Sequence, residues 1–141
     1  MKGLYPFQPK GFLGDYDQAT TVTEFWGKWN PIVRNVQFGL LRFLVRWIGS
    51  RWAVIPALFF TFGLTGFGHD LITLALTLGR RGLGFFGTIF FLLNAIVIVV
   101  ERKVKKRLLR LSVWKRRTIM IVLLNLSWII ASFLATLIGY K

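Results

Sequence analysis

Residues 53–78 read AVIPALFFTFGLTGFGHDLITLALTL, and this stretch decides the class of fold. His69 and Asp70 are its only ionisable side chains. The stretch is longer than the roughly 20 apolar residues that a helix needs to cross a bilayer. It therefore predicts a transmembrane helix, in which Pro56 and the glycines are tolerated where neighbouring protein satisfies the backbone.

Two further apolar runs follow this stretch. Neither residues 82–100 nor residues 118–140 contain a charged side chain, and each run is long enough to cross a bilayer. We therefore expect an all-α membrane protein with about three transmembrane helices. Residues 52–141 form its membrane domain, in which a basic loop at 101–117 separates the second span from the third.

The part of the chain before the first span is expected to lie at the membrane surface. Residues 25–51 predict an amphipathic basic helix, because Arg42 and Arg46 are four residues apart and share one face. Such a helix is typical of the membrane interface. The alternative is a tilted membrane helix whose arginines reach back to the headgroups.

Residues 1–24 are rich in Gly, Pro, Asp and Gln, and they predict an irregular segment. They lack the apolar core of a secretory signal peptide, so we expect insertion to use the first membrane helix. Thr21 followed by Glu24 fits a capping box, which predicts the start of a helix.

The composition favours a membrane over a nucleic acid as the partner of this basic chain. Nineteen Lys and Arg stand against five Asp and Glu, which gives a formal net charge of +14. The basic residues flank apolar runs, as in membrane proteins, and no nucleic-acid partner is expected. There is no cysteine, which excludes disulfides, thiolate metal sites and cysteine nucleophiles. No spacing of metal ligands is present either.

The distribution of positive charge predicts the orientation of the chain. Sixteen of the nineteen Lys and Arg lie before the first span or in the 101–117 loop. By the positive-inside rule, the N-terminus and this loop lie on the cytoplasmic-equivalent side, and the C-terminus lies opposite. The membrane is either a bacterial inner membrane or an organellar one. The loop is expected to bind anionic lipid through Arg102, Lys103, Lys105, Lys106 and Arg107.

His69 is the only histidine, and it lies within the first span. An ionisable residue at membrane depth is costly and therefore suggests a function. It could act as a general base, make a structural hydrogen bond to a neighbouring helix, or ligate a haem or chlorophyll-type pigment through its neutral imidazole. These three interpretations remain open at the level of the residues alone.

A second group of residues runs from Phe25 to Pro31 and reads FWGKWNP. Its two tryptophans suit a membrane interface, which makes an aromatic anchor one interpretation. The other is that Asn30 lies beside a tunnel mouth and donates a hydrogen bond to a substrate.

Together the two groups resemble the membrane-bound O-acyltransferase family, and most closely its wax-synthase-like branch. That family has a stretch of the form Phe-Trp-Gly-Arg-Arg-Trp-Asn, followed some forty residues later by Ser-Gly-x-x-His-Glu in an apolar helix. This chain has FWGKWN at 25–30 and TGFGHD at 65–70. It lacks one arginine of the first motif, and Asp70 stands in place of the glutamate. The later stretches FFLL at 90–93 and ERK at 101–103 also resemble the family.

The resemblance implies roles for two residues and a substrate class. His69 would be the catalytic base that takes the proton of an acceptor hydroxyl, and Asn30 would position the substrate or stabilise developing charge. The donor would be an acyl thioester such as acyl-CoA. The resemblance covers about residues 17–107, which correspond to the C-terminal part of the family's proteins, so we expect the N-terminal half of the family's tunnel to be absent.

Two functions follow from these observations. The first is a non-catalytic accessory or scaffold subunit of a larger membrane complex, for example a photosynthetic or respiratory one, in which a chlorophyll-type pigment could bind. The alternative is an acyl-CoA-dependent O-acyltransferase of wax-ester or lipid synthesis that uses His69 and Asn30, with the missing half supplied by a partner. We expect membrane lipids and other membrane subunits to be the partners in either case.

Overall fold

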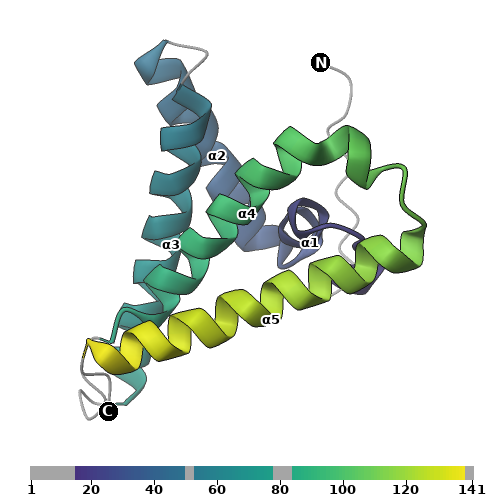
Figure 1. The fold of residues 1–141 in the computed structure, drawn as a ribbon. Helices are drawn as coiled ribbons and strands as arrows, with labels where there is room; N and C mark the ends of the chain where they lie inside the picture. The colour runs from purple at the N-terminus through teal and green to yellow at the C-terminus, as the bar shows by residue number, and fades with distance from the viewer. Residues whose placement is uncertain (1–14, 50–52, 78–83, 139–141) are drawn as a thin grey trace.

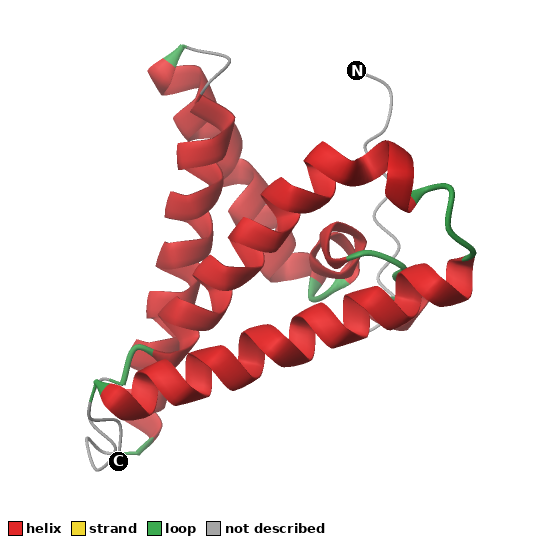
Figure 2. Ribbon diagram, in the orientation of Figure 1, coloured by secondary structure: helices red, strands yellow, loops and turns green. Residues whose placement is uncertain are grey.

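The computed structural model describes residues 15–49, 53–77 and 84–138, and within these ranges all regular structure is helical. The elements are a 3-10 helix η1 and five α-helices (Figures 1 and 2). Their bounds are η1 Tyr16–Gln18, α1 Val22–Lys28, α2 Pro31–Ile48, α3 Val54–Leu76, α4 Phe86–Leu108 and α5 Val113–Leu137. The described residues therefore confirm the all-α class.

The long helices α3, α4 and α5 form the frame of the molecule. Helix α4 packs against α3 along one side and against α5 along another, and α2 runs back along α3 (Figure 1). The short helix α1 contacts α2, α4 and α5. It lies between α4 and α5 in the part where these two helices diverge (Figure 1). Of the segment predicted to rest on the membrane surface, the part in α1 is thus packed against the long helices.

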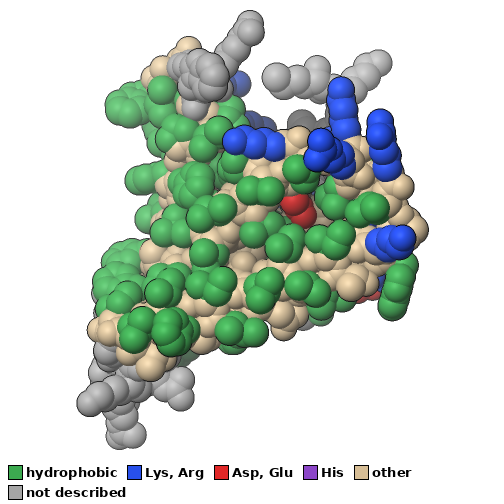
Figure 3. All heavy atoms as spheres, viewed as in Figure 1, with side chains coloured by type: hydrophobic (Ala, Val, Ile, Leu, Met, Phe, Trp, Pro, Cys, Tyr) green, Lys and Arg blue, Asp and Glu red, His purple; other side chains and the backbone are tan. Residues whose placement is uncertain are grey.

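Two helices, α3 and α5, are long and apolar enough to cross a membrane by length and composition. Only 33% of the apolar window of α3 and 22% of that of α5 are buried, whereas the core helix of a soluble protein would be mostly buried. Their exposed apolar faces suit contact with lipid. Figure 3 shows hydrophobic side chains spread over this surface, with Lys and Arg gathered where α4 is joined to α5.

The predicted count of three spans is not confirmed, because α4 does not meet the same criterion. Helix α4 begins at Phe86, and its charge-free part ends at Val100, just before Glu101. At about 1.5 Å per residue this part extends about 22 Å, which is less than the roughly 30 Å of hydrocarbon in a bilayer.

The stretch predicted as one basic helix over 25–51 is divided between α1 and α2, and residues 50–51 lie outside the described part. The break falls at Asn30, whose φ of 35° is not helical, and Pro31 then opens α2. Helix α2 is amphipathic, with Arg42 and Arg46 both exposed.

The residues expected to form a basic loop at 101–117 are largely helical. Helix α4 continues through Leu108, a short turn covers residues 109–112, and α5 begins at Val113. Lys, Arg and Leu are strong helix formers, so the helix continues into this stretch although its charged side chains lie in water.

Helix α1 is fixed at its start by two separate caps. The Thr21 hydroxyl accepts a hydrogen bond from the Glu24 N–H at 3.1 Å, as the capping box predicts. The Glu24 carboxylate, however, accepts from the N–H and hydroxyl of Thr20 instead of completing the box. The second cap comes from α4, where Glu101 accepts from the N–H groups of Val22 and Thr23, both at 2.8 Å, and from the Thr23 hydroxyl at 2.7 Å.

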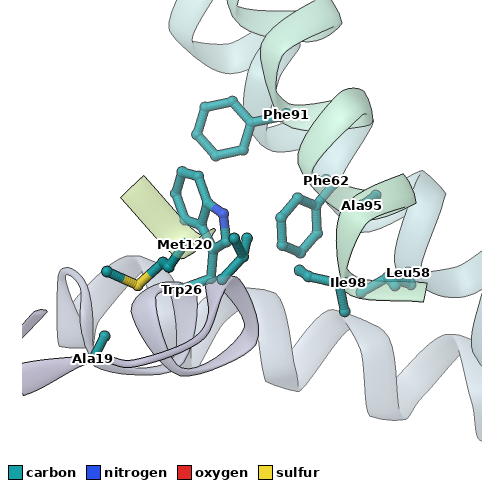
Figure 4. Close-up of a cluster of buried hydrophobic side chains, with 9 residues drawn as sticks. Ala19, Trp26, Leu58, Phe62, Phe91, Ala95, Ile98 and Met120 are labelled. Carbon is teal, nitrogen blue, oxygen red and sulfur yellow. The ribbon is translucent and has the colours of Figure 1, made fainter. Parts of the chain in front are cut away.

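The core forms around Trp26, which projects from α1 among apolar side chains of α3, α4 and α5 (Figure 4). Its indole is only 7% exposed. The buried residues around it are Leu58, Phe62, Phe91, Ala95, Ile98 and Met120. The aromatic motif at the start of the chain is therefore part of the core, and it determines how the three long helices pack.

Candidate acyl-transfer site

The Phe91 ring on α4 joins the two motifs found in the sequence. On one side the Trp26 ring lies 4.9 Å away between centroids, tilted by 43°. On another side the His69 imidazole stacks on Phe91 at 5.2 Å with an interplanar angle of 24°. Phe91 itself is 4% exposed. The structure thus brings the FWGKWN and TGFGHD stretches into contact with one buried ring.

A buried amide fixes the orientation of Trp26. The indole N–H donates to Asn94 Oδ1 at 3.1 Å, and Asn94 Nδ2 donates to the Phe90 carbonyl at 2.8 Å. Asn94 is fully buried, so losing either hydrogen bond would leave a polar atom unsatisfied in an apolar core. Asn94 was not among the residues predicted for the site, although an isolated amide within the apolar run 82–100 was the available signal.

Helices α3 and α4 cross at two glycines with their backbones in direct contact. A Cβ built on Gly66 would lie 2.6 Å from the Gly87 carbonyl oxygen and 2.6 Å from the Thr88 Cα. A Cβ on Gly87 would lie 2.8 Å from the Gly66 carbonyl oxygen and 3.1 Å from the His69 Cβ. The small residues are required here, and their close contact places His69 directly over the first turns of α4.

Asp70 caps the N-terminus of α4 from the neighbouring helix. Its carboxylate accepts from the Gly87 N–H at 2.6 Å, from the Thr88 N–H at 2.8 Å and from the Thr88 hydroxyl at 2.7 Å. Helix α4 needs this cap because its own N-cap residue, Phe85, has a φ of 51° and makes no side-chain cap. A carboxylate is also favoured by the positive end of the helix dipole. The described hydrogen bonds of Asp70 all go to α4, and His69 is not among its partners.

Replacing Asp70 with asparagine is expected to lower the free energy of unfolding by about 1–3 kcal/mol, because it turns charge-assisted hydrogen bonds into neutral ones and leaves a buried donor without a partner. The measurement is thermal unfolding of the purified chain in detergent. Asp17→Asn is the control, because that side chain is exposed and is expected to unfold as the wild type does. Equal unfolding of the two variants would show that the cap does not stabilise the α3–α4 pair.

His69 is exposed on α3, although it lies within a candidate span. Stacking on Phe91 covers one face of the imidazole and leaves the ring edge, which carries both nitrogens, uncovered by that contact. Among the described residues, neither imidazole nitrogen makes a hydrogen bond. The ring is therefore held in orientation without being used as a structural hydrogen-bonding group there.

Asn30 is buried, at 4% exposure, and has a structural task. Its Oδ1 accepts from the Val33 N–H at 3.2 Å and so caps α2. Arg34 closes the same corner by donating from Nη1 to the Gly27 carbonyl at 3.1 Å. This oxygen is thus engaged by the fold, and the role expected for Asn30 in binding a substrate remains a prediction.

Two hollows lie beside the aromatic core. One, of about 70 Å³, is bounded by α1, α2, α3 and α4, and its polar lining includes Thr23, Gln37, Thr61 and Arg102. The other, of about 300 Å³, lies between α1, α4 and α5. Neither is lined by His69 or Asn30. The two motif residues therefore lie outside these two hollows.

The five basic residues expected to bind lipid are all exposed on the last turns of α4. They are Arg102, Lys103, Lys105, Lys106 and Arg107. Cationic side chains are favoured at a helix C-terminus by the dipole, and this alone accounts for part of the cluster.

Comparison with known proteins identifies the group to which the chain is related. The model of a family described as the membrane bound O-acyl transferase family matches residues 9–93, which include both motifs and Phe91. The chain is 34% identical over 110 residues to a long-chain-alcohol O-fatty-acyltransferase of Simmondsia chinensis. That alignment covers 73% of this chain and 29% of the relative, so the chain spans less than a third of the relative's length. No solved structure matches the chain. With more than half of its residues matched by the family model, the chain belongs to the membrane-bound O-acyltransferase family.

Proposed function

We propose that the chain carries the general base of an O-acyltransferase, which moves a fatty acyl group from a thioester such as acyl-CoA to a hydroxyl. His69 takes the proton of the acceptor hydroxyl while its oxygen attacks the thioester carbonyl carbon. The C–S bond then breaks, and the protonated imidazole returns the proton to the departing thiolate. The products are an ester and a free thiol.

One observation supports this assignment above the others, namely the stacking of an exposed imidazole on Phe91 at 5.2 Å. A base must present a nitrogen edge in a fixed direction, and stacking on a buried ring holds the ring plane without occupying either nitrogen. Asp70 and the glycine crossing hold α3 against α4 and so fix this stacking. Asn30 would act by positioning, since it caps α2 directly after the aromatic motif.

The choice of substrates follows from the name of the matched relative, a long-chain-alcohol O-fatty-acyltransferase. We therefore take a long-chain alcohol as acceptor and a long-chain acyl-CoA as donor. The test is formation of labelled ester by the full chain, reconstituted in vesicles with radiolabelled acyl-CoA and the alcohol. Ester that appears only when both substrates are present supports the proposal. Absence of ester in vesicles that contain folded chain, both alone and together with a membrane fraction that could supply the missing half, would overturn it.

A second candidate is a non-catalytic subunit of a larger membrane complex. It is favoured by the wide apolar faces that α3 and α5 leave exposed. Purification in a gentle detergent, mass spectrometry and an absorption spectrum distinguish the two. Stoichiometric recovery with other subunits or with a pigment, combined with the absence of ester formation, would favour this candidate.

For the orientation we propose that the basic end of α4 faces the cytoplasmic-equivalent side and that the end of α5 faces the opposite side. The absence of cysteine allows a direct test with single introduced cysteines. In intact cells or sealed vesicles, a membrane-impermeant thiol reagent is expected to label Lys103→Cys and Thr136→Cys from opposite sides. Labelling of both positions from one side would contradict the proposed orientation. It would mean that α5 does not cross the membrane.

A further inference from the structure

The 300 Å³ hollow between α1, α4 and α5 is an open groove that the proposed acyl transfer does not use. Aromatic and aliphatic side chains form nearly all of its wall, and an amide is the exception. The lining residues are Phe25, Trp26, Trp29, Phe90, Leu124, Asn125 and Trp128. A groove of this composition beside the candidate membrane helix α5 is suited to a hydrocarbon chain.

Two arginines lie at one end of the same region, in the first turns of α5. Arg116 and Arg117 are half-buried, and the Nε of each is buried without a hydrogen-bond partner among the described residues. Arg117 donates from Nη2 to the Asp17 carbonyl at 2.7 Å, which is a neutral acceptor, so that within the described ranges no ion pair compensates the positive charge. A partly desolvated guanidinium is stabilised strongly by an anion, because water no longer screens the charge.

The arginines and the groove are aligned along α5. Arg117, Leu124 and Trp128 are separated by seven and four residues, so they lie on one face of the helix. Over these eleven residues α5 rises about 16 Å, which is close to half of the roughly 30 Å hydrocarbon core. A headgroup at Arg117 and an acyl chain reaching Trp128 would therefore fit one leaflet.

The N-terminal 3-10 helix η1 connects the two ends of this site. Asp17 accepts the hydrogen bond of Arg117, and the neighbouring Tyr16 ring packs against Phe25 with centroids 5.9 Å apart. Phe25 in turn lines the groove. Helix η1 thus contacts both the Arg117 guanidinium and one residue of the groove wall.

We propose that this region binds one anionic phospholipid, with its phosphate on Arg116 and Arg117 and one acyl chain in the groove. The acyl chain of a zwitterionic lipid fits the same groove. Its headgroup, however, carries a positive charge of its own, so it compensates the positive charge of the two arginines less well. The net charge of +14 favours an anionic headgroup further. The lipid is a resident component and not a reactant, since the groove contacts neither His69 nor Asn30, and the inference is independent of the proposed function.

Tryptophan fluorescence tests the proposal, because Trp26, Trp29 and Trp128 line the groove. The full chain is placed in phosphatidylcholine nanodiscs that contain a few mole percent of lipid brominated on one acyl chain. Brominated phosphatidylglycerol is expected to quench the fluorescence more than brominated phosphatidylcholine does. In the Arg116→Gln/Arg117→Gln variant the apparent affinity for the anionic lipid is expected to fall about tenfold or more.

The matched control is Lys103→Gln/Lys106→Gln, which removes the same charge from exposed residues of α4 and is expected to keep the selective quenching. Equal quenching by the two brominated lipids would overturn the proposal. An equal loss in both double variants would also overturn it, because a diffuse attraction of basic residues for the membrane would then explain the effect. Displacement of the lipid by acyl-CoA at low concentration would assign the groove to the donor instead.

Discussion

Replacing His69 with alanine is expected to lower the rate of ester formation by about 10²–10⁴-fold, which is the usual contribution of a general base. The loss should fall on kcat and not on KM for the alcohol, because proton removal stabilises only the transition state. The fold should survive, since the imidazole is exposed and makes no hydrogen bond among the described residues. Radiolabelled ester formation and thermal unfolding of the same preparations measure the two effects separately.

The control for this variant is Leu76→Ala, which removes an exposed side chain from the same helix two turns further on. It is expected to transfer acyl groups at the wild-type rate. If His69→Ala retained that rate as well, the imidazole would be structural, or a pigment ligand, and the assignment of a general base would be wrong.

Replacing Gly66 with alanine is expected to separate α3 from α4 and to lower the free energy of unfolding by about 1–3 kcal/mol or more. The new methyl group would lie 2.6 Å from the Gly87 carbonyl oxygen and from the Thr88 Cα, and backbone atoms cannot move aside as a flexible side chain can. The shift would also disturb the stacking of His69 on Phe91. Acyl transfer should therefore fall together with the unfolding temperature.

Gly68 provides a matched control two residues away, because nothing lies within 4 Å of a Cβ built there. Gly68→Ala is expected to be neutral, or to stabilise the chain by up to about 1 kcal/mol, since alanine loses less backbone entropy than glycine on forming a helix. Opposite signs for the two glycine variants support the close crossing. Equal effects would indicate that only helix propensity changed.

The helices and the family could be predicted from the sequence because their signals are local. The composition of an apolar run such as 53–78 is enough to predict a helix suited to hydrocarbon. In the structure α3 occupies most of this run. Thr21 marks a helix start by its own side-chain chemistry, and it caps α1 in the structure. The two motifs, whose order and spacing resemble the family, lie within the matched residues 9–93.

The contacts that build the site could not be predicted, because they join residues far apart in the chain. Glu101 caps α1 across 79 positions, and the Trp26 indole meets Asn94 across 68. The sequence around Glu101 or Asn94 does not indicate which distant residue each of them binds. The basic stretch 101–117, which connects the last two predicted spans, is largely helical in the structure, as the helix propensity of its Lys, Arg and Leu residues favours.

The most direct test of the central claim uses the fact that His69 is the only histidine of the chain. Diethyl pyrocarbonate is added to the reconstituted protein, and peptide mass spectrometry follows the adduct on His69 while ester formation is measured in parallel. Acyl transfer is expected to fall in proportion to this adduct, to return when hydroxylamine removes it, and to be protected by the long-chain alcohol. A chain that is fully modified at His69 and still forms ester at the original rate would contradict the account.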